Sequence, residues 1–255
     1  MANVIILTGF GINSDYESQY AFELAGAQNV QRVHLNQLIE GKVDLQNYEI
    51  LMFPGGFSFG DHLGSGRVLA NKFRYNLRKE LKNFIDQDKL IFGVCNGFQI
   101  LVKMGVLPAF NGNMFDQNVS LVGNASGKFE SRWIKMKPLD SKCVWTQGYE
   151  HHLELPVRHG EGRFVAKNNS ILDKLEKKKL ITFVYDPNEY PNNPNGAARG
   201  VAGICDETGR VYGMMPHPEC HLYKYHHPNW TRGVEPKENG LKIFKNAVRY
   251  VEEKF

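Results

Sequence analysis

Short apolar runs alternate with longer amphipathic stretches along the N-terminal part of the chain. Each apolar run stops at glycine, proline or a polar turn, as a strand buried on both faces does. The runs that we predict to be strands are Asn3–Leu7, Gln31–Leu35, Glu49–Phe53 and Leu90–Val94. Strands separated by helices of about ten or more residues pair in parallel through right-handed crossovers. The pattern therefore predicts an α/β fold with an open, mainly parallel sheet flanked by helices.

Helical spacing of apolar residues marks the segments between these strands. Ser14 and Glu17 have the serine-x-x-glutamate spacing of a capping box, which predicts a helix beginning there. One long amphipathic helix is predicted from Leu69 to Phe84, because apolar residues recur every three or four positions. Another helix is predicted directly after Cys95, and a final one over Leu241–Glu253.

Beyond Phe129 the pattern changes to short strand candidates that follow one another, broken by glycine and proline. Such segments favour antiparallel strands or a sheet edge. The candidates are FESRWIKM at 129–136, RFVA at 163–166, ITFVY at 181–185, GVAGIC at 200–205 and RVYGMM at 210–215. Residues 188–200 and 220–233 are loops by composition, and neither has the character of a domain linker. We therefore expect a single domain over residues 1–255, with antiparallel strands in its C-terminal half.

Composition and charge exclude several classes of protein. Hydrophobic residues make up 42% and charged residues 23%, which excludes a disordered chain. The net charge is only +4, and the densest basic run, Lys174–Lys179, contains a glutamate and indicates a solvated helix face rather than a nucleic-acid site. No window holds the roughly eighteen apolar residues of a spanning helix, and the N-terminus lacks signal-peptide features. We expect neither a nucleic-acid nor a membrane partner.

The cysteines indicate a reducing compartment, and one of them has unusual neighbours. Cys95, Cys143, Cys205 and Cys220 form no C-x-x-C pair, which in a chain of this size favours free thiols and a cytoplasmic location. Cys95 lies between two glycines in GVCNG at 93–97, after an apolar strand and before a helix. This is the layout of the nucleophile elbow G-x-S-x-G with sulfur in place of oxygen. Cys143 and Cys205 lack such a context, so a buried structural role is expected for them.

The residue types around Cys95 suit a nucleophile. A sharp strand-to-helix turn is strained, and small residues two positions to either side avoid a clash. The helix N-terminus favours thiolate over thiol, and the N–H of Asn96 is placed to donate into an oxyanion hole. The rival interpretation is a buried cysteine at a tight turn, because short motifs also occur by chance.

A thiolate in this role needs a base, and His217 is the best candidate. Met215-Pro216-His217-Pro218-Glu219 follows a predicted strand, and its two prolines restrict the backbone around the histidine. In an extended segment His217 and Glu219 leave the chain on one side, so the carboxylate can orient the imidazole toward a thiol. A lone surface histidine in a proline turn is the rival interpretation.

Pro54-Gly55-Gly56 ends a third predicted strand. Ligands bind at the carboxyl ends of strands in open parallel sheets. Gly55 and Gly56 let bare backbone approach a substrate carbonyl, and Gly56 is the candidate for the second oxyanion donor. A phosphate-binding loop is the rival, but the spacing G-x-x-x-x-G-K-[ST] is missing. No metal site is predicted.

Taken together, these motifs resemble the class I, or triad, glutamine amidotransferases, in which a glycine-rich loop, a G-x-C-x-G elbow and a late H-P-E occur in this order. Among them the chain is most similar to the glutaminases of phosphoribosylformylglycinamidine synthase. The similarity extends over most of the chain. The matching segments are GFSFGD at 56–61, GVCNGFQ at 93–99, FESRW at 129–133, HGEGRF at 159–164, NPNG at 193–196 and GMMPHPE at 213–219.

The resemblance implies a flavodoxin-like fold and a chemistry. Cys95 attacks the side-chain amide of glutamine, His217 protonates the departing ammonia, and water hydrolyses the γ-glutamyl thioester. Ammonia then passes through the complex to a synthetase subunit, an ATP- and magnesium-dependent C–N ligase of purine synthesis, and a small accessory subunit is expected as well. No cofactor is expected in this chain itself. Gln99 is a candidate for contacting glutamine.

His159, Glu161 and Arg163 form a charged, glycine-spaced segment that either is a surface turn or couples the chain to its partner. Cys220 stands where the resembling family usually has arginine, so the role of that arginine is in doubt here. A second thiol near the site also suggests sensitivity to oxidation. The histidine-rich segment at 220–233 matches no standard zinc spacing, and a solvated or partner-contact loop is expected.

Three other functions stay open on the sequence alone. The first is a glutaminase of the same class serving a synthase of anthranilate, carbamoyl phosphate or GMP. The second is a cysteine hydrolase or stress protein on the same scaffold, for which loss of Glu219 would matter little. The third is a non-catalytic binding module.

Overall fold

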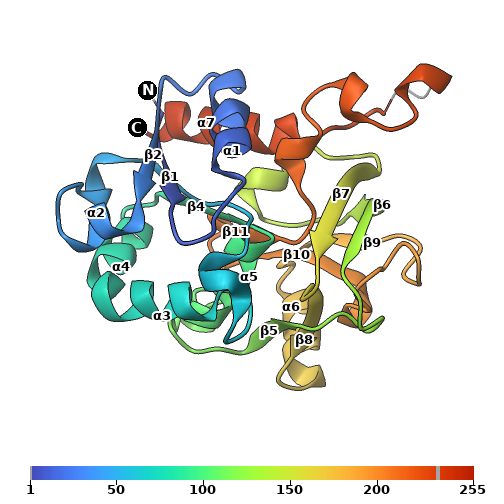
Figure 1. Cartoon of the computed structure of the whole chain (residues 1–255), viewed down its shortest axis with the longest axis horizontal. Coiled ribbons are helices and arrows are strands. Elements are labelled where there is room, and N and C mark those ends of the chain that lie inside the picture. The colour runs from blue at the N-terminus through green and yellow to red at the C-terminus, as the bar shows by residue number, and fades with distance from the viewer. Residues whose placement is uncertain (1, 234–235) are drawn as a thin grey trace.

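The computed structural model describes residues 2–233 and 236–255. Within them a nine-stranded sheet has the order β2-β1-β3-β4-β11-β10-β9-β6-β7, and β5 and β8 form a separate two-stranded sheet (Figure 1). The strands are β1 (Asn3–Thr8), β2 (Asn29–His34), β3 (Ile50–Phe53), β4 (Leu90–Val94), β5 (Val119–Val122), β6 (Glu130–Pro138), β7 (Leu153–His159), β8 (Arg163–Ala166), β9 (Ile181–Tyr185), β10 (Val201–Cys205) and β11 (Val211–Met214). The helices are α1 (Asp15–Leu24), α2 (Leu35–Ile39), α3 (Arg67–Asn76), α4 (Arg78–Asp86), α5 (Asn96–Met104), α6 (Asn169–Lys177) and α7 (Leu241–Lys254).

The predicted fold class is confirmed. Strands β2, β1, β3, β4 and β11 run parallel, and the pairs from β11 through β10, β9 and β6 to β7 are antiparallel. Figure 1 shows α1 and α7 on one side of the parallel strands and α3 and α5 on the other. No helix in the described part of the chain is long and apolar enough to cross a membrane.

The structure corrects three sequence predictions about elements. The predicted helix from Leu69 to Phe84 is two helices, because Leu77 leaves helical backbone at φ −127° between α3 and α4. Helix α1 begins as predicted, but the Ser14 side chain makes no capping bond. The candidate RVYGMM forms β11, which pairs antiparallel with β10 as predicted but also in parallel with β4, so it lies inside the sheet and not at an edge. The candidate RFVA forms an antiparallel strand as predicted, β8, which pairs with β5 outside the main sheet.

Two strands escaped prediction. Strand β7 contains Pro156, and a proline within an apolar run argues against a strand. The strand forms because β7 is the last strand of the sheet, and an edge strand tolerates the missing N–H of proline. Strand β5 is short and pairs only with β8. The omission of β7 matters, because this strand turns back over the carboxyl ends of the parallel strands.

Aromatic packing joins the central strands to the helices on both faces. Phe92 of β4 stacks on Tyr212 of β11, with ring centroids 5.1 Å apart. Phe22 of α1 meets Phe244 of α7 edge-on at 4.9 Å. On the other face, a β-carbon at Gly213 would lie 2.2 Å from the ring of Phe98, so glycine allows α5 to pack closely on β11. These contacts fix the strands and the helix that carry the polar motifs.

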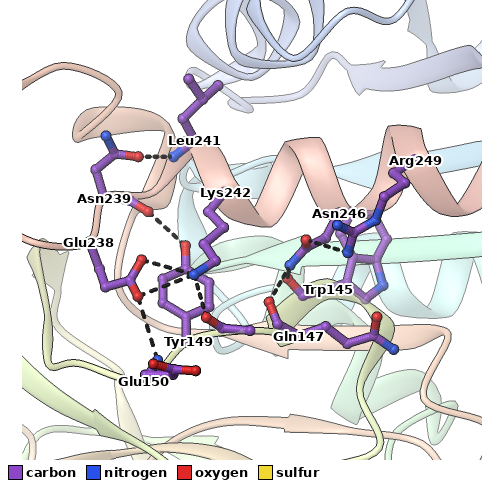
Figure 2. A network of polar contacts seen from close by, with 11 residues as sticks. Trp145, Gln147, Tyr149, Glu150, Glu238, Asn239, Leu241, Lys242, Asn246 and Arg249 are labelled. Carbon is purple, nitrogen blue, oxygen red and sulfur yellow. Dashed lines mark hydrogen bonds and ion pairs between the residues drawn. The ribbon is translucent and has the colours of Figure 1, made fainter.

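Helix α7 is held by polar contacts to the segment before β7 (Figure 2). Asn246 donates to the carbonyls of Trp145 and Gln147, each at 2.9 Å. At the start of the helix the Lys242 ammonium pairs with Glu238 at 3.1 Å. Gly240, just before α7, is so close to the Pro218 carbonyl that a β-carbon would lie 2.0 Å from its oxygen. The C-terminal helix therefore positions the backbone next to His217.

Candidate active site

The three predicted motifs meet at one edge of the sheet. Gly55 and Gly56 follow β3, Cys95 follows β4, and His217 follows β11. These strands are neighbours and parallel, so their carboxyl ends lie side by side. The Cys95 N–H also donates to the Met214 carbonyl at 2.8 Å, which extends the β4–β11 ladder to the elbow.

Cys95 has the strained backbone expected of a nucleophile elbow, with φ 51° and ψ −104°. A β-carbon at Gly97 would lie 1.9 Å from the Phe53 carbonyl oxygen, and one at Gly93 would lie 2.7 Å from the Gly97 carbonyl. Both glycines are therefore required by close backbone approach, for the reason predicted from the motif. A non-glycine residue held at this geometry marks a site where surrounding packing maintains strain.

The sulfur lies at the N-terminal end of α5, for which Cys95 is the N-cap residue. The first-turn N–H groups of a helix have no partner within it, and they attract negative charge. The N–H of Asn96 is one of these groups, and its role as an oxyanion donor stays a prediction. The thiol itself is buried and donates to the Arg158 carbonyl on β7 at 3.6 Å.

His217 and Glu219 form a buried pair. Nδ1 of the imidazole lies 2.6 Å from Oε1 of Glu219, and the side chains are 4% and 0% exposed. Burial alone lowers the pKa of His217, but the charges of Glu219 and Cys95 and hydrogen bonding to them raise it to about 10. Nε2 has no partner of full hydrogen-bond geometry among the described residues. This ring nitrogen is the one available to the Cys95 thiol, which lines the same cavity as His217.

Gly55 and Gly56 give the site its shape. The Gly55 carbonyl accepts the N–H groups of Asn13 and Ser14, each at 3.2 Å, which holds the loop after β1 against the loop after β3. A β-carbon at Gly55 would lie 2.9 Å from Cε1 of His217, and one at Gly56 would lie 2.7 Å from the Gly11 carbonyl. Only glycine fits at either position.

These groups line a cavity of about 130 Å³, enough for a side-chain amide but not for a nucleotide. Larger hollows of about 460 and 470 Å³ occur elsewhere, but they contain neither the elbow cysteine nor the H-P-E residues. The small cavity is therefore the candidate active site. Its lining consists of Asn13, Ser14, Gly56, Phe57, Cys95, Phe129, Arg158 and His217.

Gln99 does not line this cavity and is 3% exposed. Its Oε1 accepts from the Asn96 side chain at 2.9 Å, and its Nε2 donates to the Glu161 carbonyl at 2.6 Å. Asn96 in turn accepts the Ser58 N–H at 3.2 Å. Gln99 thus ties the elbow to the glycine-rich loop and to the segment after β7, and contact with glutamine stays a prediction.

His159, Glu161 and Arg163 are not a plain surface turn. His159 ends β7 and is 2% exposed, and burial, followed by the nearby charge of His217, lowers its pKa to about 4. Glu161 accepts the Ser65 N–H at 3.1 Å and lies 3.8 Å from the buried Lys103 ammonium. Arg163 begins β8. His159 thus lies near His217, and Glu161 contacts Ser65 and Lys103. Coupling of this segment to a partner stays a prediction.

Two further cysteines and two histidines are buried packing residues. Cys143 and Cys205 are fully buried and near each other, and desolvation followed by the neighbouring Cys205 thiol raises the Cys143 pKa. In the 220–233 segment, His221 and His227 are buried and flank the Trp133 ring, each with centroids 5.2 Å away. This segment is thus packed rather than a solvated loop at those histidines.

Cys220 lies behind the H-P-E motif. Ligand atoms of His217, Glu219 and Cys220 all lie within 4.8 Å of one another. Because Nδ1 of His217 already bonds the Glu219 carboxylate, we interpret this group as the orienting pair with a thiol beside it rather than as a metal site. Burial, followed by the charge of Glu219, raises the Cys220 pKa, so this thiol stays neutral.

Sequence reasoning missed five residues of the lining: Asn13, Ser14, Phe57, Phe129 and Arg158. The rings of Phe57 and Phe129 lie 6.2 Å apart and are both largely exposed, so they border the mouth of the cavity. Exposed aromatic residues carry no sequence signal of their own. Asn13 lies in the loop after the first parallel strand. The carboxyl ends of the parallel strands carry the other motifs, so this position could have indicated a site residue.

Comparisons with known proteins show what the chain is similar to. The chain matches the CobB/CobQ-like glutamine amidotransferase domain over residues 1–251. It is 42% identical to phosphoribosylformylglycinamidine synthase subunit PurQ of Methanococcus maripaludis, over 97% of this chain and 96% of that protein. The subunit of the same name in Dehalococcoides mccartyi is 44% identical over 96% of each chain. In the solved structure of PurLQS from Thermotoga maritima, a chain matches with TM-score 0.74 and 28% identity, over 98% of this chain and 99% of that one.

Proposed function

Because the chain belongs to the CobB/CobQ-like family of glutamine amidotransferases, we propose that it is the glutaminase subunit of a phosphoribosylformylglycinamidine synthase. It hydrolyses glutamine to glutamate and ammonia. The resemblance drawn from the motifs is confirmed by relatives that match almost the whole chain. The observation that carries the chemistry is the buried His217–Glu219 pair beside a cysteine at the end of the neighbouring strand.

The geometry supports a two-step mechanism. The Cys95 sulfur attacks the side-chain carbonyl carbon of glutamine, and the oxygen takes up negative charge that the N–H groups of Asn96 and Gly56 stabilise. The His217 imidazolium gives its Nε2 proton to the amide nitrogen, the C–N bond breaks, and ammonia leaves a γ-glutamyl thioester. Water then attacks the thioester while His217 accepts its proton, and glutamate departs as the thiolate returns. Glu219 holds the imidazole and its positive charge throughout.

The chain acts within a complex that contains a synthetase subunit. We propose further that the synthetase binds ATP and magnesium and uses the ammonia to convert formylglycinamide ribonucleotide to its amidine. The same proposal includes a small accessory subunit. It also includes a cytoplasmic location, which the free cysteines support.

Trapping with a glutamine-like diazoketone, 6-diazo-5-oxonorleucine, tests the chemistry. Reaction of the complex should give one adduct, which peptide mapping places on Cys95, and the other three cysteines serve as internal controls. Glutamate release with the synthetase present should disappear in Cys95→Ser. An adduct on Cys220, or glutaminase activity that survives Cys95→Ser, would contradict the assignment. Identifying the acceptor nucleotide used by the complex separates this synthase from those of anthranilate, carbamoyl phosphate or GMP.

A further inference from the structure

Arg158 stands at the rim of the active-site cavity. It lies on edge strand β7, one residue before its end, opposite Ser131 of β6. Its carbonyl accepts the Cys95 thiol at 3.6 Å, while its side chain is exposed and lines the cavity with Cys95 and His217. Within the described lining, Arg158 is the single lysine or arginine.

The position of the arginine side chain is fixed by a neighbour. Its Nη2 contacts Sγ of Cys220, directly after Glu219 in the chain. The high pKa of the Cys220 thiol, caused by burial first and the Glu219 charge second, keeps this partner neutral. Because the Cys220 thiol is neutral, it positions the guanidinium without cancelling its positive charge. The other N–H groups of the guanidinium can then bind an anion.

The substrate supplies such an anion at the matching place. Glutamine has a side chain of only a few carbons, and its amide carbon must reach Cys95 inside a cavity of about 130 Å³. Its α-carboxylate is then left at the mouth, next to the rim. Guanidinium groups bind carboxylates through paired, charge-assisted hydrogen bonds.

Building on the proposed glutaminase function, we propose that Arg158 is the specificity-determining residue that binds the α-carboxylate of free glutamine. It selects the free amino acid over amides that lack this group. A side chain with only a structural role, holding Cys220 in place, would not distinguish the two.

The test uses the complex with its synthetase subunit and compares Arg158→Met with Lys135→Met, which removes the same charge from an exposed position on β6. Two electrophiles probe Cys95. The diazoketone 6-diazo-5-oxonorleucine carries the α-carboxylate, whereas iodoacetamide is small and neutral. We expect Arg158→Met to slow the diazoketone reaction and raise KM for glutamine about 10- to 100-fold, the order for losing a charge-assisted hydrogen bond. Iodoacetamide alkylation and kcat should change less than about threefold, as in Lys135→Met.

A rescue variant separates the guanidinium from the fold. R158M/C220R returns a guanidinium to the same rim from the contacting position and should recover most of the diazoketone rate. Equal loss of both reactions in R158M, or an unchanged KM, overturns the proposal. If the wild-type complex itself forms no diazoketone adduct on Cys95, the glutaminase function fails instead, so the two failures are distinguishable.

Discussion

The imidazole of His217 packs directly on Gly55: a β-carbon at this glycine would lie 2.9 Å from Cε1 and 3.5 Å from Nδ1 of the ring. The glycine-rich loop thus sets the ring position from one side, while Glu219 fixes it from the other. Gly55→Ala should displace the ring and lower kcat about 100-fold, since a shift of about 1 Å costs that much in a reacting geometry.

Gly123→Ala is the matched control for this change, because a β-carbon there meets nothing within 4 Å. The two variants should have similar thermal unfolding midpoints, while glutamate release separates them. Full activity in Gly55→Ala would show that the loop does not position the ring.

Glu219→Gln should change how activity depends on pH. The carboxylate is the main influence that raises the His217 pKa to about 10 against the opposing effect of burial. Without its charge the His217 pKa falls, so a smaller share of the imidazole carries a proton at a given pH. Fewer enzyme molecules can then protonate the leaving ammonia and the ring loses its orienting partner, so kcat should fall about 10²- to 10⁴-fold, with the alkaline limb of the pH profile at lower pH.

Kinetic pH profiles of glutaminase activity check this expectation, and Glu238→Gln, near α7 and away from the cavity, is the control. A variant that keeps both its rate and its alkaline limb would instead favour the cysteine hydrolase alternative, for which loss of Glu219 would matter little.

The sequence predicted the parallel half of the fold and the catalytic trio because these depend on local rules. Apolar runs ending at glycine mark buried strands, and a cysteine between two glycines marks an elbow. His217 was paired with Cys95 because two prolines restrict its backbone and Glu219 lies two residues away, although the strand before it was expected to be antiparallel or at an edge. The break at Leu77 was hidden, because the apolar spacing continues across it while the backbone departs from helix.

The rest of the site depends on β7, which sequence reasoning missed. This strand returns over the parallel strands, where Pro156 accepts the His217 N–H at 3.0 Å and Arg158 accepts the Cys95 thiol. Such contacts between an edge strand and distant loops have no local signature. For the same reason the 159–163 segment was interpreted as a possible surface turn, although His159 is buried by the fold around it.

His159 should make the protein sensitive to acid. The pKa of His159 is about 4 in the folded protein, against 6.5 for an ordinary histidine. The unfolded chain therefore binds a proton at this residue below pH 6.5, whereas the folded chain binds it only near pH 4. The contribution of neutral His159 is fully present above pH 6.5 and is lost as pH falls toward 4, by about 3 kcal/mol. His159→Gln should remove this part of the decline.

Urea unfolding at pH 7.5 and 4.5 measures the effect as a difference between the two pH values. His151→Gln, at an exposed position before β7, is the control and should retain the wild-type decline. Identical declines in wild type and His159→Gln would show that His159 does not stay neutral in the fold.

Gln99→Met decides between two roles for this residue. The sequence resemblance predicts contact with glutamine, whereas the structure uses both ends of the amide to join Asn96 to the Glu161 carbonyl. If the network positions Asn96 and the Ser58 loop, the variant should lose about 10-fold or more in kcat, because the oxyanion donors shift, while KM changes little. Gln87→Met, exposed at the end of α4, controls for the substitution. Steady-state kinetics with the synthetase present makes the comparison, and a raised KM with unchanged kcat would return Gln99 to substrate binding.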